Sequence, residues 1–214
     1  MLRLSLVGPG NVDFHFYELL GMPWQKYEKH ITEIAKVLAD KKIELVLAPD
    51  KGVSFDIAKK FKIAGGKKVV GAVPYDDKDF GIRHLHDYIT SEIHGKKVFD
   101  EFINTKDWYR QNLTLTIYGD AVLYLGTSLG SIGELAFGFY LYKLFLGKKK
   151  GVKTQKLSKE IRAGKKFPLS VIVYKPFVKG KLSKEIESYI KSLKGRIYYV
   201  KNPDELKKVL RKFN

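Results

Sequence analysis

The sequence predicts an α/β fold, a Rossmann-like three-layer sandwich with a mostly parallel sheet of six or seven strands. Apolar runs of four to six residues alternate with helix-length segments along the chain. Strands of a parallel sheet are buried on both faces, so they form continuous apolar runs with helical crossovers between them. The chain has 214 residues and no low-complexity stretch, so we expect one domain that spans residues 1–214.

The first half of the chain alternates three predicted strands with two predicted helices. The strands are expected at residues 4–7, 43–47 and 69–73. Apolar residues recur at helical spacing from Tyr27 to Leu38, which predicts the first helix. Ser54 is expected to cap the second helix, which ends near Gly65. Residues 75–106 form a long connection whose signals are mixed.

The second half continues the alternation with strands at residues 121–125, 169–174 and 196–200. An apolar helix is expected from about Gly130 to Leu146. Ser183 and Asn202-Pro203 carry the signals of two further helix starts. A lysine-rich insertion at about 147–166, with a short helix expected near 157–163, interrupts this pattern.

Charge is concentrated in one part of the chain. The net charge is +17, and residues 143–166 contain ten basic residues and one acidic residue. Such a segment is either a solvated insertion, which we favour, or an arm that binds polyanions such as nucleic acid. We expect it to be exposed and to bind DNA or RNA weakly and without sequence preference. Lysine-rich, cysteine-free and glutamine-poor composition is also typical of thermophiles.

Composition excludes several classes of protein. The chain has no cysteine, so disulfide frameworks, thiolate zinc sites and cysteine nucleophiles are excluded. It has no apolar run of about 18 residues and no signal-peptide pattern, so we expect a cytoplasmic protein without a membrane span. His84 and His86 are two residues apart, which would place them on opposite sides of a strand, and no third ligand accompanies them. No metal site is predicted, and the sequence requires no cofactor.

The loop between Gly126 and Ser131 is the strongest functional signal. It follows a buried strand, contains small and hydroxyl residues, and precedes an apolar helix. Exposed N–H groups at such a helix start bind anions, usually phosphate, and we expect an anion at the N–H groups of Gly130 and Ser131. Ser131 and Glu134 also match a capping box, and spacing alone slightly favours this structural role for Glu134.

Four separated patterns occur in a familiar order: Ala48-Pro49-Asp50 with Gly52-Val53-Ser54, then Ala64-Gly65-Gly66 with a strand ending at Pro74, then residues 126–134, then residues 200–206. The chain resembles the SLOG superfamily of Rossmann-like proteins. That superfamily includes the Lonely Guy phosphoribohydrolases, molybdenum-cofactor carrier-like proteins and, more distantly, the DNA-processing protein DprA. Its signature is Pro-Gly-Gly-x-Gly-Thr-x-x-Glu, and here Gly130, Ser131 and Glu134 take the places of the second Gly, the Thr and the Glu.

The resemblance implies a ligand crevice, and it implies a catalytic pair of arginine and glutamate in the phosphoribohydrolases. Here the arginine position holds Gln111, and Arg110 lies one residue earlier, about 100° away on a helix. Glu134 and Arg110 are therefore the candidate catalytic residues. Trp108 and Tyr109 either stack on a base or belong to the core. The residues expected to bind the ligand are Gly8, Gly10, Gly52, Ser54, Gln111, Asn112, Gly126, Thr127, Ser128, Gly130 and Ser131.

Three functions remain open from the sequence. We favour the binding of a phosphorylated small ligand, such as a nucleotide, by a carrier or sensor. The alternatives are a nucleoside 5′-monophosphate phosphoribohydrolase, which Gln111 disfavours, and a nucleic-acid-binding protein. The apolar helix of residues 135–146, a region through which the family commonly dimerises, predicts a symmetric homodimer.

Overall fold

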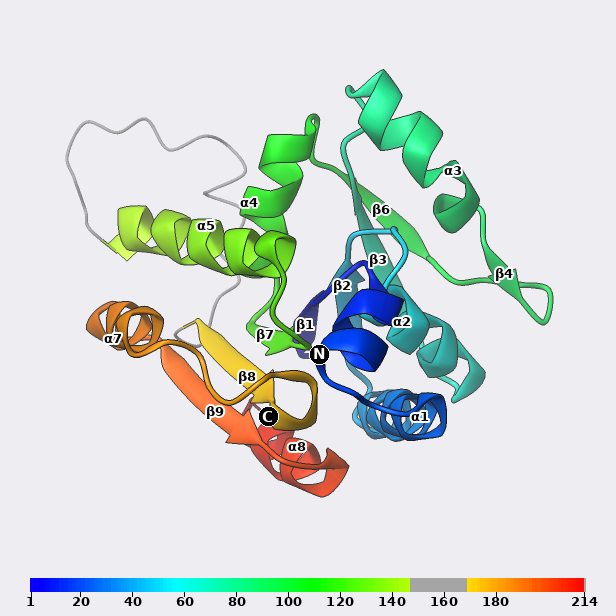
Figure 1. Cartoon of the computed structure of the whole chain (residues 1–214). Helices are drawn as coiled ribbons and strands as arrows, with labels where there is room; N and C mark the ends of the chain where they lie inside the picture. Colours follow the sequence, from blue (N-terminus) through cyan, green and yellow to red (C-terminus); the bar gives the residue numbers. More distant parts are fainter. Residues whose placement is uncertain (147–168, 214) are drawn as a thin grey trace.

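The computed structural model describes residues 1–146 and 169–213, which form an α/β sandwich around a seven-stranded parallel sheet (Figure 1). The strand order is β6-β3-β2-β1-β7-β8-β9. The strands are β1 (Arg3–Val7), β2 (Glu44–Leu47), β3 (Lys68–Val73), β6 (Glu101–Asn104), β7 (Ala121–Tyr124), β8 (Ser170–Tyr174) and β9 (Arg196–Val200). This confirms the predicted fold class. The direction of winding reverses between β1 and β7, which makes a switch point where ligands bind in open α/β sheets.

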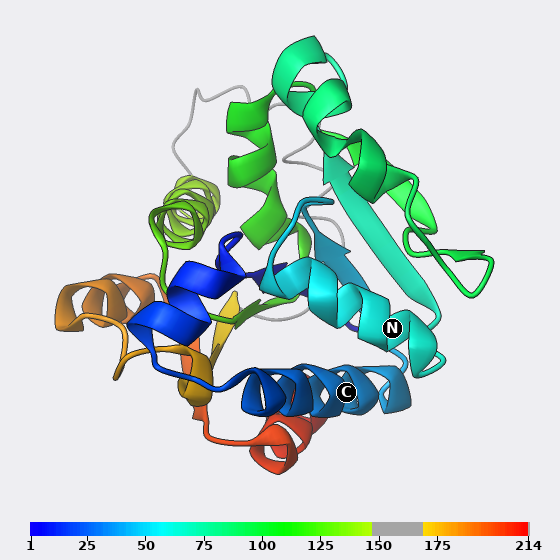
Figure 2. The same cartoon turned by 45° about the vertical axis from the view of Figure 1, so that its right-hand side comes forward.

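Helices cover both faces of the sheet (Figures 1 and 2). One layer holds α1 (Trp24–Asp40), α2 (Val53–Ile63) and α8 (Pro203–Leu210), and the other holds α4 (Trp108–Tyr118), α5 (Leu129–Leu146) and α7 (Lys184–Ser192). In the described part of the chain, no helix is long and apolar enough to cross a membrane. The lysine-rich segment 147–166 and the helix expected near 157–163 lie outside the described residues.

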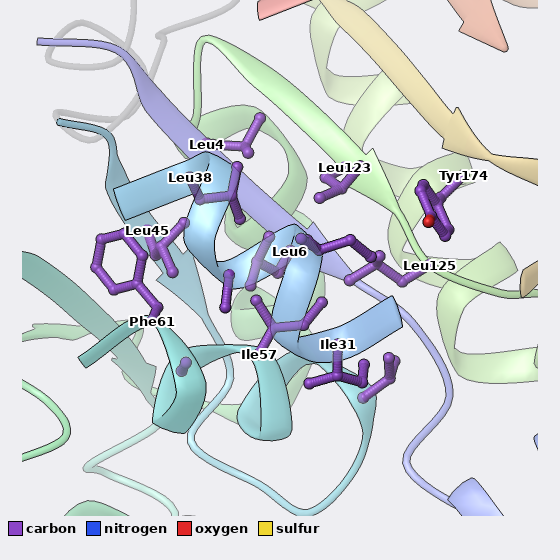
Figure 3. Packing of buried hydrophobic residues seen from close by; sticks show 14 of the residues in the cluster. Leu4, Leu6, Ile31, Leu38, Leu45, Ile57, Phe61, Leu123, Leu125 and Tyr174 are labelled. Atoms are coloured by element: carbon purple, nitrogen blue, oxygen red, sulfur yellow. The ribbon is translucent and has the colours of Figure 1, made fainter. Parts of the chain in front are cut away.

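The larger core lies between the sheet and the layer of α1, α2 and α8 (Figure 3). Leu4, Leu6 and Leu45 from the strands pack with Ile31 and Leu38 of α1, and all five side chains are fully buried or nearly so. Each buried side chain of this size stabilises the fold by roughly 1.5–3 kcal/mol relative to exposure. The helical spacing read from the sequence therefore identified the buried face of α1.

The connection between β3 and α4 contains elements that the sequence did not reveal. After the π-helix η2 (Lys78–Arg83) come α3 (His84–Ile89), a small hairpin of β4 (Glu92–Ile93) and β5 (Lys96–Lys97), and the edge strand β6. Strand β6 was not predicted because it is short and its exposed terminal residues interrupt the apolar run that marks a buried strand. The strand geometry assumed for His84 and His86 is wrong, because both residues lie on α3.

The helix starts are partly as predicted. Ser183 and Asn202 are N-caps whose side-chain oxygens accept hydrogen bonds from the N–H groups of Ile186 and Glu205, at 3.3 and 2.9 Å. The prediction for Ser54 is wrong, since Gly52 is the N-cap of α2. Gly52 has φ +122°, and a Cβ there would approach the Cα of Gly10 to 2.6 Å. Only glycine readily adopts this backbone with so close a neighbour.

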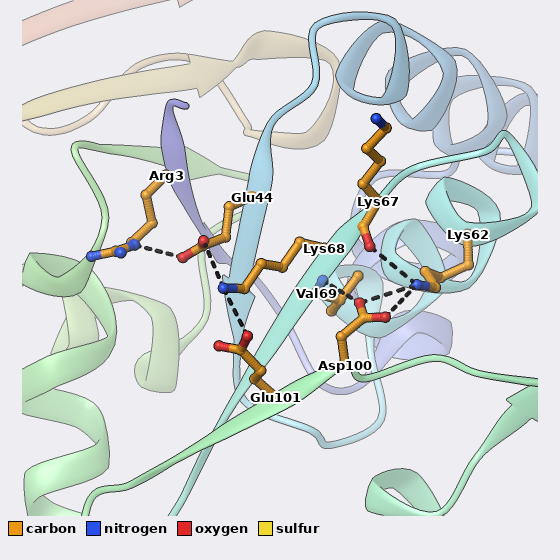
Figure 4. A network of polar contacts seen from close by, with 8 residues as sticks. All are labelled: Arg3, Glu44, Lys62, Lys67, Lys68, Val69, Asp100 and Glu101. Atoms are coloured by element: carbon orange, nitrogen blue, oxygen red, sulfur yellow. Dashed lines mark hydrogen bonds and ion pairs between the residues drawn. The ribbon is translucent and has the colours of Figure 1, made fainter.

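The amino edge of the sheet carries a ladder of alternating charges (Figure 4). Arg3, Glu44, Lys68 and Glu101 are the first residues of β1, β2, β3 and β6. Arg3 Nε lies 2.6 Å from Glu44 Oε1, and Lys68 Nζ lies 3.4 Å from Glu44 Oε2 and 2.9 Å from Glu101 Oε1. The ladder joins four neighbouring strands at the edge opposite the carboxyl ends.

Candidate functional site

A cavity of about 130 Å³ lies at the carboxyl edge of the sheet, beside the switch point between β1 and β7. Four segments meet there: the loop after β1, the loop after β2 with the start of α2, and the N-terminal parts of α4 and α5. The lining residues are Leu6, Gly8, Pro9, Gly10, Ala48, Asp50, Lys51, Ser54, Trp108, Gln111, Asn112, Leu115, Ser128, Gly130, Ser131 and Glu134.

Most of the predicted site residues line this one cavity. The structure brings together Gly8, Gly10, Ser54, Gln111, Asn112, Ser128, Gly130, Ser131 and Glu134, whereas Gly52, Gly126, Thr127 and Arg110 are not in its lining. Lys51 and Leu115 were absent from the prediction. Leu115 had a detectable signal, since it lies three and four residues after Asn112 and Gln111 on the same helix face.

Gly126 shapes the loop behind the cavity. It has φ +140°, and a Cβ there would lie 2.8 Å from both His15 Nε2 and Pro9 Cδ. His15 itself is buried and its Nε2 lies 3.0 Å from the carbonyl oxygen of Phe177. The glycine thus lets the loop after β7 pass directly over the loop after β1.

The start of α5 is capped by two serines. Ser128 N–H donates to Ser131 Oγ at 2.7 Å, and Ser131 N–H donates to Ser128 Oγ at 3.1 Å. The capping box predicted between Ser131 and Glu134 is therefore wrong. The helix begins at Leu129, so Ser131 already lies in its first turn and its N–H already has an acceptor.

The cap leaves two backbone donors open. Within the described residues, the N–H groups of Leu129 and Gly130 have no acceptor. The first N–H groups of a helix lack intrahelical partners and carry the positive end of the helix dipole. Gly130 is exposed and lines the cavity, so its N–H is available to an anion.

Glu134 lies one turn further along α5, partly buried in the cavity wall. Its backbone carbonyl accepts a hydrogen bond from Thr116 Oγ1 at 2.8 Å, but its carboxyl has no hydrogen-bond partner among the described residues. Burial raises the pKa of the Glu134 carboxyl to about 8. At neutral pH this group is therefore mostly protonated and is able to donate a hydrogen bond to a ligand.

Asp50 brings a second carboxyl group to the cavity, and this one is partnered. Its Oδ1 accepts a hydrogen bond from Lys51 N–H at 2.7 Å, and His84 Nε2 of α3 lies 3.3 Å from its carboxylate. Asp120 is far from this chemistry: it accepts a hydrogen bond from Arg3 N–H at the amino edge of the sheet. The part of the chain that the structure describes holds no cluster of three potential metal ligands.

No family model matches the chain, and no curated protein matches it. Solved structures do match over nearly its whole length. A protein called TM1055 has a TM-score of 0.60 at 16% identity, and the match covers 99% of each chain. The molybdenum cofactor binding protein from Rippkaea orientalis has a TM-score of 0.58 at 14% identity, and the molybdenum cofactor carrier protein from Chlamydomonas reinhardtii has 0.58 at 16%. Both of these matches cover 99% of this chain and 96% of the other. The chain therefore shares the fold of these proteins.

Proposed function

We propose that this chain is a carrier or sensor within the SLOG superfamily. It binds a phosphorylated small ligand at the carboxyl-edge cavity, and a nucleotide is the first candidate. The observation that carries the proposal is that several hydrogen-bonding groups without partners lie close together. The Gly130 N–H group and the Glu134 carboxyl line the cavity and have no partners among the described residues, and the neighbouring N–H group of Leu129, outside the lining, also has none. Open N–H groups at a helix start bind anions, and a cavity with a few converging polar groups is suited to a small ligand.

The charges at the site are compatible with an anion. The Glu134 carboxyl is mostly neutral at pH 7, since its pKa is raised to about 8. Asp50 has two partners, Lys51 N–H and His84. The helix start supplies the attraction, because N–H groups and the helix dipole together favour a phosphate.

Binding is better supported than hydrolysis of a nucleotide. Arg110, the candidate partner of Glu134, lies outside the cavity and pairs with Asp107, with 3.3 Å between Nε and Oδ2. The solved proteins of the same fold include ones described as binding or carrying the molybdenum cofactor. That description supports a carrier, with the molybdenum cofactor as a further ligand to test.

The test is a thermal-shift panel of AMP, GMP, ribose 5-phosphate, inorganic phosphate and the molybdenum cofactor. A ligand present at 100 times its dissociation constant stabilises the folded chain by about 2.7 kcal/mol. We expect at least one phosphorylated ligand to raise the melting temperature in a saturable way. If every member of the panel leaves it unchanged at millimolar concentration, the proposal is wrong.

A further inference from the structure

The α4 wall of the cavity differs in chemistry from the α5 wall. Trp108, Asn112 and Leu115 lie on one face of α4, spaced four and three residues apart, and all three line the cavity. They present an aromatic ring, a carboxamide and an aliphatic group. The α5 wall carries the open N–H group of Gly130, which is suited to a phosphate. One small cavity therefore joins an aromatic surface to a helix start with an open N–H group.

The size of the cavity limits what enters it. Its volume is about 130 Å³. Clefts that enclose whole drug-sized ligands measure roughly 300–1,000 Å³. A cavity of about 150 Å³ holds a benzene ring. The six-membered ring of a base therefore fits inside, and the remainder of a nucleotide, including the five-membered ring of a purine, stays outside.

Two side chains offer hydrogen bonds to the edge of such a ring. The Asn112 carboxamide and the Glu134 carboxyl both line the cavity, and neither has a hydrogen-bond partner among the residues that the structure describes. A carboxamide and a protonated carboxyl each present a donor beside an acceptor. This is the pattern with which asparagine binds the edge of adenine through two hydrogen bonds.

We infer that the cavity takes a planar nitrogen heterocycle, which stacks against Trp108 and bonds by its edge to Asn112 and Glu134, while the phosphate of the same ligand lies at the exposed start of α5. The inference rests on the proposed function and adds to it the class of the ligand and its orientation. It also assigns Trp108 the recognition of the ring and Gly130 that of the phosphate. Removal of Trp108 and removal of the anion site then affect different parts of the ligand.

Tryptophan fluorescence tests the ring directly, because the chain has two tryptophans, Trp24 and Trp108. Trp24 is 54% exposed at the start of α1 and does not line the cavity. In a Trp24→Phe variant the emission comes from Trp108. We expect AMP or GMP to quench it saturably and ribose 5-phosphate to bind without quenching. Saturable binding of the nucleotides with unchanged emission would overturn the inference.

Variants of α4 give the second measurement. Trp108→Ala is expected to weaken AMP or GMP binding roughly 5- to 150-fold, the range of base stacking on aromatic residues, and to leave ribose 5-phosphate binding unchanged. Trp108→Phe should keep most of the affinity. The matched control is Tyr109→Ala, since Tyr109 is 82% exposed on the same helix turn and outside the lining.

The outcomes separate this inference from the proposed function. If ribose 5-phosphate binds and the heterocycle adds no affinity, or if Trp108→Ala weakens both ligands equally, the ring assignment is wrong and the phosphate site stands. If neither the nucleotides nor ribose 5-phosphate bind, the proposed function fails and this inference fails with it.

Discussion

Gln111 and Arg110 are neighbours on α4 that lie in different depressions of the surface. Gln111 is buried in the wall of the carboxyl-edge cavity, and its Nε2 donates a hydrogen bond to the carbonyl oxygen of Ala72 at 2.6 Å. Arg110 lines a shallow depression with Asp76, Asp77, Lys78, Lys106 and Asp107. The rotation of about 100° per helical residue thus places Arg110 outside the cavity that Glu134 lines.

The first prediction is that the protein releases little or no ribose 5-phosphate from AMP. Cleavage of an N-glycosidic bond needs charge stabilisation at the sugar and a proton donor or cation for the departing base. A neutral Glu134 supplies no charge to the sugar, and Gln111 supplies none where the resemblance to the phosphoribohydrolases implies an arginine. The measurement is a ribose 5-phosphate release assay on the wild type.

Two single variants, Glu134→Gln and Arg110→Ala, are compared with the wild type in this assay. Robust turnover by the wild type that is lost in Glu134→Gln would make the protein an enzyme. If Arg110→Ala then also lost turnover, the displaced arginine would be the missing group. Nucleotide binding without turnover in all three proteins is the result we expect.

The second prediction concerns the anion site on α5. Gly130→Leu should abolish stabilisation by phosphorylated ligands, because the side chain would project into the cavity beside the open N–H group. The fold should persist, since only Ser128 Oγ, at 3.9 Å, lies near a Cβ built at this glycine. The matched control is Gly133→Leu, at a glycine of the same helix that has open space around it and does not line the cavity. If Gly130→Leu binds phosphorylated ligands as tightly as the wild type does, the anion site is not at this helix start.

The third prediction concerns the double-serine cap. Ser128→Ala removes the acceptor of the Ser131 N–H, so we expect the free energy of unfolding to fall by about 1 kcal/mol in urea denaturation. Ser183→Ala is the matched comparison, because Ser183 caps α7 and does not line the cavity. We expect both variants to lose similar stability. An unchanged midpoint for Ser128→Ala would show that the cap contributes nothing.

The sequence predicted the sheet well because buried parallel strands have a strong apolar signal. The runs at residues 4–7, 69–73 and 196–200 all became strands, within one residue at their ends. Strand β6 could not be predicted in this way, because its exposed Glu101 and Asn104 interrupt the apolar pattern. The connection between β3 and α4, which contains η2 and α3, depends on tertiary contacts. One of them joins His84 to Asp50, and no local sequence pattern reveals it.

The site was predictable in location and less so in detail. Loops at the carboxyl ends of parallel strands must converge, and this placed Gly8, Ser54 and Gly130 around one cavity. The cap at α5 was misassigned by three residues because serine, a good N-cap residue, occurs at both positions 128 and 131, while only Ser131 has a glutamate three residues later. Because of that shift, the Glu134 carboxyl is not used in the cap, and Glu134 lines the cavity.

The fourth prediction is a symmetric homodimer that uses α5. Phe137 and Tyr140 are 52% and 58% exposed on this helix, and an apolar groove of about 270 Å³ lies between α5 and α7. Exposed apolar patches of this kind mark interaction surfaces. Light scattering should give twice the chain mass, and Tyr140→Glu should shift the protein to monomer while the exposed Tyr109→Glu should not. A wild-type monomer at high concentration would reject the dimer.

The fifth prediction concerns pH and follows from the raised pKa of Glu134. A free glutamate ionises near pH 4.3, whereas the folded chain holds this proton to about pH 8. The unfolded state therefore binds fewer protons than the folded state between these values. The contribution of this group to the free energy of unfolding is fully present below about pH 4.5 and is lost as the pH rises to about 8. The total loss is at most a few kcal/mol, because the slope is about 1.4 kcal/mol per pH unit for one proton.

Glu134→Gln isolates this contribution, since glutamine has a similar shape and does not titrate. Urea denaturation across pH 5–9 should show the wild type losing stability relative to Glu134→Gln as pH rises, and the exposed control Glu92→Gln should parallel the wild type. Phosphate-ligand affinity should follow the same proton: above pH 8 the ionised carboxyl repels the anion, so wild-type binding weakens while Glu134→Gln binding does not. Parallel stability curves for the wild type and Glu134→Gln would show that the carboxyl is already ionised at neutral pH. The cavity would then hold two carboxylates, Asp50 and Glu134, and would favour a ligand group rich in hydrogen-bond donors over a phosphate.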